Sequence, residues 1–246
     1  MPFDALLVID DAGEAQERIL HGVAVVPARL DALPNGRIVV GGRSPVGNRN
    51  TQIFGRDGRP RRGFATGEHT AFLMADRRNN LWTAYTDEGI YGDPLSAAGL
   101  ARWDSGGNRL WEYWPPAGVS HIADIGALNV TDSTAWAVYW PHSPLVETRA
   151  SGQLRVRDQP VTSPRGLAVH GDRVVMLGGR RGGFHHPDGL HYCRLTDAGA
   201  VLVEDGEAVL TMPGGDPLRS PARPVGRGRN LYVRGRSAKQ WYVLGL

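Results

Sequence analysis

The chain contains little of three things that often organise a protein: cysteine, lysine and long apolar runs. Its 246 residues include a single cysteine, Cys193, which excludes an internal disulfide and a cysteine-rich zinc site. The fold must therefore be held together by packing. We expect Cys193 to be a small buried residue in a strand beside Tyr192, as is usual for a free cysteine.

No apolar run approaches the roughly 18 residues of a membrane-spanning helix. The first residues carry Asp4, Asp10 and Asp11 and lack the basic segment and apolar stretch of a signal peptide. These absences predict a cytoplasmic protein with no membrane partner. Lys239 is the only lysine, so the net charge of +3 comes from arginine, and nucleic-acid binding is a minor hypothesis because no dense basic run is interleaved with aromatic residues.

The chain is rich in short strand patterns. Hydrophobic residues make up 41% and charged residues 22% of it, as in ordinary globular proteins, and no stretch shows sustained helical spacing free of glycine and proline. Turn signals such as Asn35-Gly36 and Asn79-Asn80 separate the strand patterns. Strands are expected at 5–9, 17–20, 29–33, 37–40, 51–54, 62–65, 71–74, 81–85, 99–104, 110–114, 127–130, 134–140, 144–148, 153–156, 166–169, 173–177, 191–195, 201–204, 222–225, 230–233 and 240–244.

The inner hairpin turns divide these strands into repeated units. The turns lie at intervals of 44, 53, 40 and 55 residues, and each interval suits one four-stranded blade of a β-propeller. We therefore predict an all-β fold in one domain, residues 1–246: a five-bladed β-propeller closed by the N-terminal strands, beside the strand at 240–244. A six-bladed ring and a β-sandwich are the alternatives. The turns that mark the units are at Asn35, Asn79, Asp132, Asp172 and Arg227.

The loops of such a propeller separate into two faces. One face would carry only short turns of asparagine, aspartate and glycine, whereas the loops of the other face are longer and hold the ionisable residues that are candidates for a site. We expect a site at the central mouth of the second face. The predicted ligand-binding residues are Glu68, His69, Asp87, Glu88, His121, Asp124, Tyr139, His142, Arg165 and Arg223.

Asp87 and Glu88 follow the end of a strand and precede Gly89. Two adjacent carboxylates can raise one another's pKa, which suits acid or base chemistry, or they can bind a cation. The plainer interpretation is that one carboxylate caps the loop and the other is solvated. Candidates for catalysis are Glu88, Asp87 and His121.

Histidine and carboxylate pairs recur at equivalent positions in successive units. Glu68 with His69, and His121 with Asp124, would approach the same axis and form either a divalent-metal site or a polar lining of the mouth. The sequence identifies no cofactor and leaves metal binding open. In the segment 180–191, RRGGFHHPDGLH, the histidine spacing matches no metal-binding signature, and we interpret this segment as a mobile loop over the channel.

One part of the chain resembles a known group. The segment 82–92, WTAYTDEGIYG, together with GLARWDSGGNRLWEY and the ALNV segment at 127–130, resembles an uncharacterised group of bacterial β-propeller-like proteins over roughly residues 70 to 180. The acidic pair of that group's pattern corresponds to Asp87 and Glu88, whereas Ile125-Gly126 stands where many members have Cys-Tyr. The blades also resemble the broad NHL and YVTN-type propeller class, which includes binding modules, lyases and hydrolases, so the resemblance implies a fold and no single activity.

Three functions fit these observations. The first is a propeller that binds a small polar ligand or a partner segment at the mouth, through residues such as Asp87, Glu88 and His69. The second is a hydrolase or lyase on the same face, with Glu88 or Asp87 as base and a histidine as acid or metal ligand. The third is a protein-protein scaffold.

Overall fold

The computed structural model describes the chain except residues 12, 13, 46, 133, 182, 183, 186, 217–223 and 236–239. The described residues are nearly all β, which confirms the all-β part of the predicted fold. They form two compact units, Met1–His121 (unit 1) and Ile122–Leu246 (unit 2).

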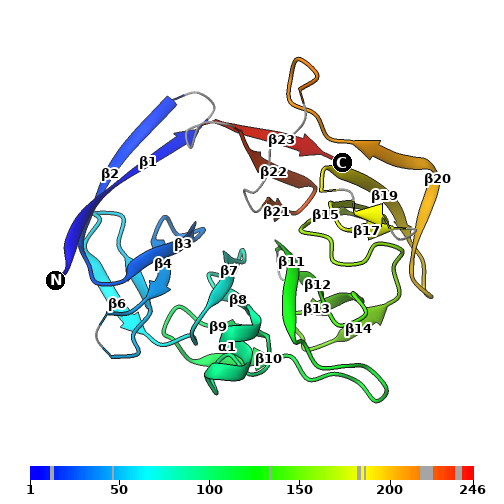
Figure 1. Cartoon of the computed structure of the whole chain (residues 1–246). Coiled ribbons are helices and arrows are strands. Elements are labelled where there is room, and N and C mark those ends of the chain that lie inside the picture. The colour runs from blue at the N-terminus through cyan, green and yellow to red at the C-terminus, as the bar shows by residue number, and fades with distance from the viewer. Residues whose placement is uncertain are drawn as a thin grey trace. The chain divides into compact units, whose positions relative to one another are not determined.

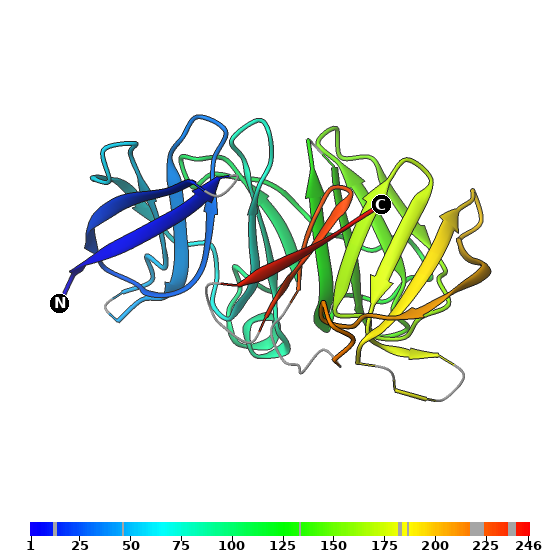
Figure 2. The same cartoon turned by 90° about the horizontal axis from the view of Figure 1, so that it is seen from above.

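Unit 1 contains one hairpin and two four-stranded antiparallel sheets (Figure 1). The hairpin, drawn in dark blue in Figure 2, joins β1 (Phe3–Asp11) to β2 (Glu14–Val23). The predicted pairing of this segment with the strand at 240–244 stays a prediction. The two sheets consist of β3 (Val26–Ala32), β4 (Ile38–Arg43), β5 (Thr51–Phe54) and β6 (Pro60–Phe64), and of β7 (Thr70–Ala75), β8 (Leu81–Tyr85), β9 (Leu100–Trp103) and β10 (Arg109–Glu112).

The core of unit 1 follows from alternation along its inner strands. In β4, Ile38 and Val40 pack with residues of β2 on one face of the sheet, whereas Val39 packs on the other face with Leu73 and Leu81 of the next sheet. Successive side chains of a strand point to opposite faces, so a strand that is apolar at every position is buried on both. The inner strands are therefore covered by apolar side chains on both faces.

Unit 2 contains a seven-stranded sheet, a four-stranded sheet and a short two-stranded ribbon. In the seven-stranded sheet, a four-stranded antiparallel meander is joined to a three-stranded one through a parallel bridge between Asn129 and Gly226. The strands of the first sheet are β11 (Asp124–Thr131), β12 (Thr134–Trp140), β13 (Leu145–Arg149), β14 (Leu154–Arg157), β21 (Val225–Arg227), β22 (Asn230–Arg234) and β23 (Trp241–Gly245). The second sheet contains β15 (Gly166–His170), β16 (Arg173–Leu177), β19 (Gly189–Leu195) and β20 (Ala200–Val209), and the ribbon contains β17 (Arg180–Arg181) and β18 (Phe184–His185).

One buried side chain of unit 2 connects two strands, β11 and β15, with the turn between β21 and β22. Asn129 of β11 is fully buried, and its Nδ2 donates to the carbonyl oxygens of Leu167 and Gly228, each at 2.9 Å. Its Oδ1 accepts from the backbone N–H of Gly228 at 3.0 Å. Gly226 lies against the same region, and a Cβ there would be 1.8 Å from the Leu167 oxygen. Asn129 thus satisfies backbone groups that no strand ladder reaches.

The structure corrects three local predictions. Residues Asp87–Gly92, predicted to be a loop, form the short helix α1. The segment that begins at Arg180, predicted to be one mobile loop, contains the two-stranded ribbon of β17 and β18, although Gly182, Gly183 and His186 lie outside the described residues. Its mobility stays a prediction. The predicted turn at 226–228 begins later, because Val225–Arg227 is strand β21.

The aromatic residues around 113–114 and 136–140 divide into two groups. Tyr113, Trp136 and Tyr139 are buried, whereas Trp114 and Trp140 are mostly exposed. In the part of the chain that the structure describes, no helix is long and apolar enough to cross a membrane.

Candidate functional site

The end of β8 is fixed by a chain of buried hydrogen bonds. Trp103 Nε1 donates to Thr83 Oγ1 at 2.8 Å, and that hydroxyl lies 2.6 Å from the Tyr85 hydroxyl. The Tyr85 hydroxyl in turn donates to the carbonyl oxygen of Thr66. Burial raises the pKa of Tyr85, so the hydroxyl stays protonated and remains a donor. The loop that precedes β7 is thereby held against the end of β8.

His69 and Glu88 meet at this strand end. His69 Nδ1 lies 4.0 Å from Glu88 Oε2, and the two side chains are 57% and 65% exposed. Thr86 Oγ1 donates to the same carboxylate oxygen at 2.6 Å. The antiparallel register, in which Thr70 lies opposite Tyr85, brings the two loops together. The fold therefore brings His69 and Glu88 together within unit 1.

The other two predicted residues here, Glu68 and Asp87, have structural contacts. The backbone N–H of Glu68 donates to Asp93 Oδ2 at 2.9 Å, and its carbonyl oxygen accepts from Ser96 Oγ at 3.1 Å. Asp87 Oδ1 accepts from the backbone N–H of Glu88 at 2.9 Å, as expected of a loop-capping carboxylate. Gly89 allows the close approach of the two loops, because a Cβ there would lie 2.4 Å from the Glu68 oxygen.

The neighbouring carboxylate of Asp87 does not raise the pKa of Glu88. Its pKa is lowered, chiefly by the hydrogen bond from Thr86, with a smaller contribution from the charge of His69. The expectation that two adjacent acids raise one another's pKa is therefore wrong for Glu88. The carboxylate is ionised at neutral pH and can accept hydrogen bonds from a ligand.

Thr86→Val is expected to return the pKa of Glu88 toward its ordinary range, because it removes the largest cause of the shift. A lowered folded-state pKa stabilises the fold above the unfolded-state pKa, and this effect disappears as the pH falls through the folded-state value. Carbon-13 NMR of the Glu88 carboxyl against pH measures the shift. An unchanged titration curve in the variant would rule out the Thr86 bond as the cause.

His121 has a different neighbour. Its ring makes an edge contact with the exposed ring of Trp114, with ring centroids 5.3 Å apart. An edge-to-face contact is favourable between such rings. The role of His121 as an acid stays a prediction.

The remaining predicted residues belong to unit 2. Asp124 opens β11 opposite Trp140, Tyr139 is buried within β12, and His142 is exposed in the following turn. Arg165 Nη2 donates to the carbonyl oxygen of Pro187 at 2.5 Å, and partial burial lowers the pKa of Arg165. Arg223 lies outside the described residues. Among the described residues, no group of three or more histidine, cysteine or acidic side chains is arranged to hold a metal ion.

Comparison with known proteins identifies the class of fold. Virginiamycin B lyase from Staphylococcus aureus has 16% sequence identity and a TM-score of 0.55, over 92% of this chain and 69% of the lyase. A streptogramin B lyase structure gives the same identity and TM-score over 89% of this chain and 65% of that one, so the chain spans about two thirds of the lyases' length. A chain of a nidogen/laminin complex has 9% sequence identity and a TM-score of 0.52, and the match covers 97% of this chain and 84% of that chain.

These neighbours are β-propellers. The chain has a propeller-type fold. No family model and no curated protein sequence matches it. At these identities the likeness concerns the fold alone, which both enzymes and proteins of binding complexes share.

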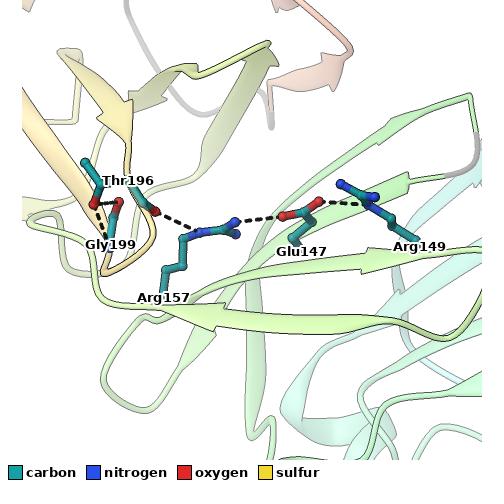
Figure 3. Close-up of polar contacts among 5 residues, drawn as sticks. All are labelled: Glu147, Arg149, Arg157, Thr196 and Gly199. Atoms are coloured by element: carbon teal, nitrogen blue, oxygen red, sulfur yellow. Dashed lines mark hydrogen bonds and ion pairs between the residues drawn. The ribbon is translucent and has the colours of Figure 1, made fainter.

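Unit 2 of this propeller-type chain contains a buried ion pair that the sequence analysis missed (Figure 3). Arg157 Nη2 lies 2.9 Å from Glu147 Oε2, and the two side chains are 7% and 6% exposed. Arg149 Nε lies 3.2 Å from the other oxygen of Glu147. Arg157 Nε also donates to the carbonyl oxygen of Thr196 at 3.3 Å. Both partners are strand residues, Glu147 in β13 and Arg157 at the end of β14, and the Thr196 carbonyl oxygen belongs to the turn that follows β19.

Strand register explains how these charges gather. Trp136 of β12 lies opposite Glu147 of β13, which lies opposite Arg155 of β14. Residues two positions apart share a face, so Arg149 and Arg157 point the same way as these three. The signal in the sequence was the alternation of charge in Glu147-Thr148-Arg149 and Arg155-Val156-Arg157.

Proposed function

We propose that this protein is a β-propeller that binds a small polar ligand at the end of β8, through His69, Thr86 and Glu88. The observation that carries the proposal is the distance of 4.0 Å between His69 Nδ1 and Glu88 Oε2, with both side chains more than half exposed. This distance is too long for a hydrogen bond, so the imidazole and the carboxylate can both bind an incoming group. Hydroxyl and amide groups match them, because each can donate to Glu88 and contact His69.

Buried contacts hold the backbone around the proposed ligand site in place. The Tyr85 hydroxyl and the contact of Gly89 with Glu68 hold the two loops in one arrangement. A site on such a support loses little conformational freedom when it binds a ligand. Roles in ligand binding for Asp124, Tyr139, His142, Arg165 and Arg223 stay predictions.

His69→Gln and Glu88→Gln are each expected to weaken binding by about tenfold, because a neutral amide replaces the imidazole or the carboxylate and forms weaker hydrogen bonds with a ligand. The measurement is titration calorimetry with a hydroxyl- or amide-bearing compound found by thermal-shift screening of the full chain. Glu112→Gln is the matched control, since Glu112 is an exposed carboxylate of unit 1 in β10. Equal affinity of the wild type and both site variants would refute the proposal.

A protein segment is the alternative occupant. The double variant Asp87→Ala with Glu88→Ala separates the two cases when binding to a captured partner is measured. Unchanged partner binding by the folded double variant would favour a scaffold surface elsewhere.

A lyase or hydrolase is the second candidate function. It is favoured by the pairing of a histidine with an ionised carboxylate on a fold that is shared with two lyases. Glu88 would act as the base and His69 as the acid. Loss of turnover in Glu88→Gln, with ligand affinity retained, would favour the enzyme over the binder.

We also propose that residues 1–246 form one five-bladed ring closed by the N-terminal strands. The support is the repeat itself: four meanders of four strands, followed by the three strands β21 to β23. A blade of three strands lacks one outer strand, which the N-terminal segment would supply. A six-bladed ring is the alternative, with β1 and β2 as a reduced blade.

A further inference from the structure

Unit 2 has two adjoining hollows beside the Glu147–Arg157 ion pair. Their volumes are about 640 and 470 Å³, and both are lined by Trp136, Glu147, Arg149 and Gly171. In the larger hollow, Arg155 and Arg157 face Asp172, Thr196 and Asp197, which come from the turns of the neighbouring sheet. This space is large enough for a small metabolite.

Arg157 offers a donor that the protein does not use. Its Nε and Nη2 are bound to Thr196 and Glu147, whereas Nη1 is buried and has no hydrogen-bond partner among the described residues. Buried donors in native proteins are nearly always paired, so a bound water or a ligand atom is expected to accept from this nitrogen. The guanidinium also lies 5.6 Å from the centroid of the Trp136 ring. This contact and the ion pair fix the plane of the guanidinium before a ligand arrives.

The charges around the hollow define the ligand. Both oxygens of Glu147 are engaged by arginines, which compensates its charge, and Arg155 adds an exposed positive charge at the rim. The opposite wall carries Asp172 and Asp197, and Asp172 lies 3.5 Å from Arg194 Nε. A ligand with only an oxyanion would be attracted by Arg155 and Arg157 but would offer no hydrogen-bond donor to Asp172 and Asp197. A ligand that fits both walls carries an oxyanion next to hydrogen-bond donors.

We propose that this hollow binds a small carboxylate that also bears hydroxyl or ammonium groups, as hydroxy acids and amino acids do. The carboxylate accepts from Arg157 Nη1 and lies near Arg155. The hydroxyl or ammonium groups donate to Asp172 and Asp197. The hollow lies in unit 2 and uses none of the residues proposed above for ligand binding in unit 1.

Titration calorimetry of the full chain at low ionic strength tests this site with gluconate as the hydroxy acid and glutamate as the amino acid. Glycerol, which has hydroxyl groups and no carboxylate, is the negative control. We expect one of the two acids to bind and Arg157→Lys to weaken that binding by about tenfold. Lysine keeps a cation beside Glu147 but lacks the planar second donor of arginine. Binding of gluconate would indicate a hydroxy acid as the ligand, and binding of glutamate would indicate an amino acid.

Arg155→Gln provides a second variant in case Arg157→Lys does not fold. Arg155 is exposed, so the variant should fold, bind several-fold more weakly and show a smaller salt dependence. Arg180→Gln is the matched control. Arg180 is also an exposed arginine, but it follows the C-terminal end of β16, whereas Asp172 of the hollow precedes the N-terminal end. His69→Gln should leave this binding unchanged.

Three results would overturn the proposal. One is that neither acid binds the wild type. Another is that glycerol binds as well as the acids, and the third is that Arg180→Gln weakens binding as much as Arg155→Gln.

Discussion

Arg157→Met is expected to lower the free energy of unfolding by about 3 kcal/mol, the lower end of the range for breaking a buried ion pair. The variant leaves the Glu147 carboxylate, which is 6% exposed, without its nearer cation. Arg149 remains 3.2 Å from Glu147 and limits the loss. Urea denaturation, followed by fluorescence and circular dichroism, measures the change.

The double variant Glu147→Leu with Arg157→Met shows how much of the stability loss comes from the unpaired charge and how much from the lost packing contacts of Arg157. Removing both charges leaves no uncompensated carboxylate, so its stability should lie within about 1 kcal/mol of the wild type. If the double variant were as unstable as Arg157→Met, the contacts of Arg157 with Trp136 and Thr196 would account for the loss.

Asn129→Ala is expected to cost about 2 to 3 kcal/mol of unfolding free energy. The side-chain amide makes three hydrogen bonds to backbone groups of Leu167 and Gly228, and the variant leaves buried groups unpaired. The Gly228 oxygen keeps the N–H of Val169 as a partner, which limits the cost. The same urea denaturation measures the change.

Asn230→Ala is the matched control for Asn129. Asn230 is only partly buried, and its contact with the Tyr232 hydroxyl is long, at 3.4 Å. Its loss should be about 0.5 kcal/mol or less, as for most surface changes. Equal losses in the two variants would mean that the hydrogen bonds of Asn129 to Leu167 and Gly228 do not stabilise the fold.

Most strands could be predicted because their local signals agree with their environment. Leu81–Tyr85, Thr134–Trp140 and Arg173–Leu177 were predicted with the bounds that they have in the structure. Each is a run of mostly apolar residues next to a turn signal, which is the strongest pattern available to a single sequence.

The local predictions that failed depend on short or distant contacts. Helix α1 has six residues, fewer than two turns, so no helical periodicity can emerge from its sequence. Gly226 is typical of a turn, but it forms a parallel bridge with Asn129 and lies against Leu167, and both residues are far from it in the sequence. Tertiary contacts of this kind override local preference.

The candidate sites were predictable to different degrees. The approach of His69 to Glu88 follows from two loops at one end of a hairpin, a local relation that the turn at Asn79 already indicates. The bond from Thr86 that lowers the pKa of Glu88 depends on side-chain geometry. The contact of Arg157 with Thr196 joins residues 39 apart in sequence, and only the packing of two sheets creates it.

The single thiol has a practical value for studying this chain. Cys193 is 2% exposed in β19, as its sequence context predicted, and burial raises its pKa to about 11. Thiol reagents attack the thiolate, so the folded form is protected both sterically and by protonation. Because the sequence has no other cysteine, alkylation counted by intact mass is a natural reporter of the opening of unit 2, with no engineered label.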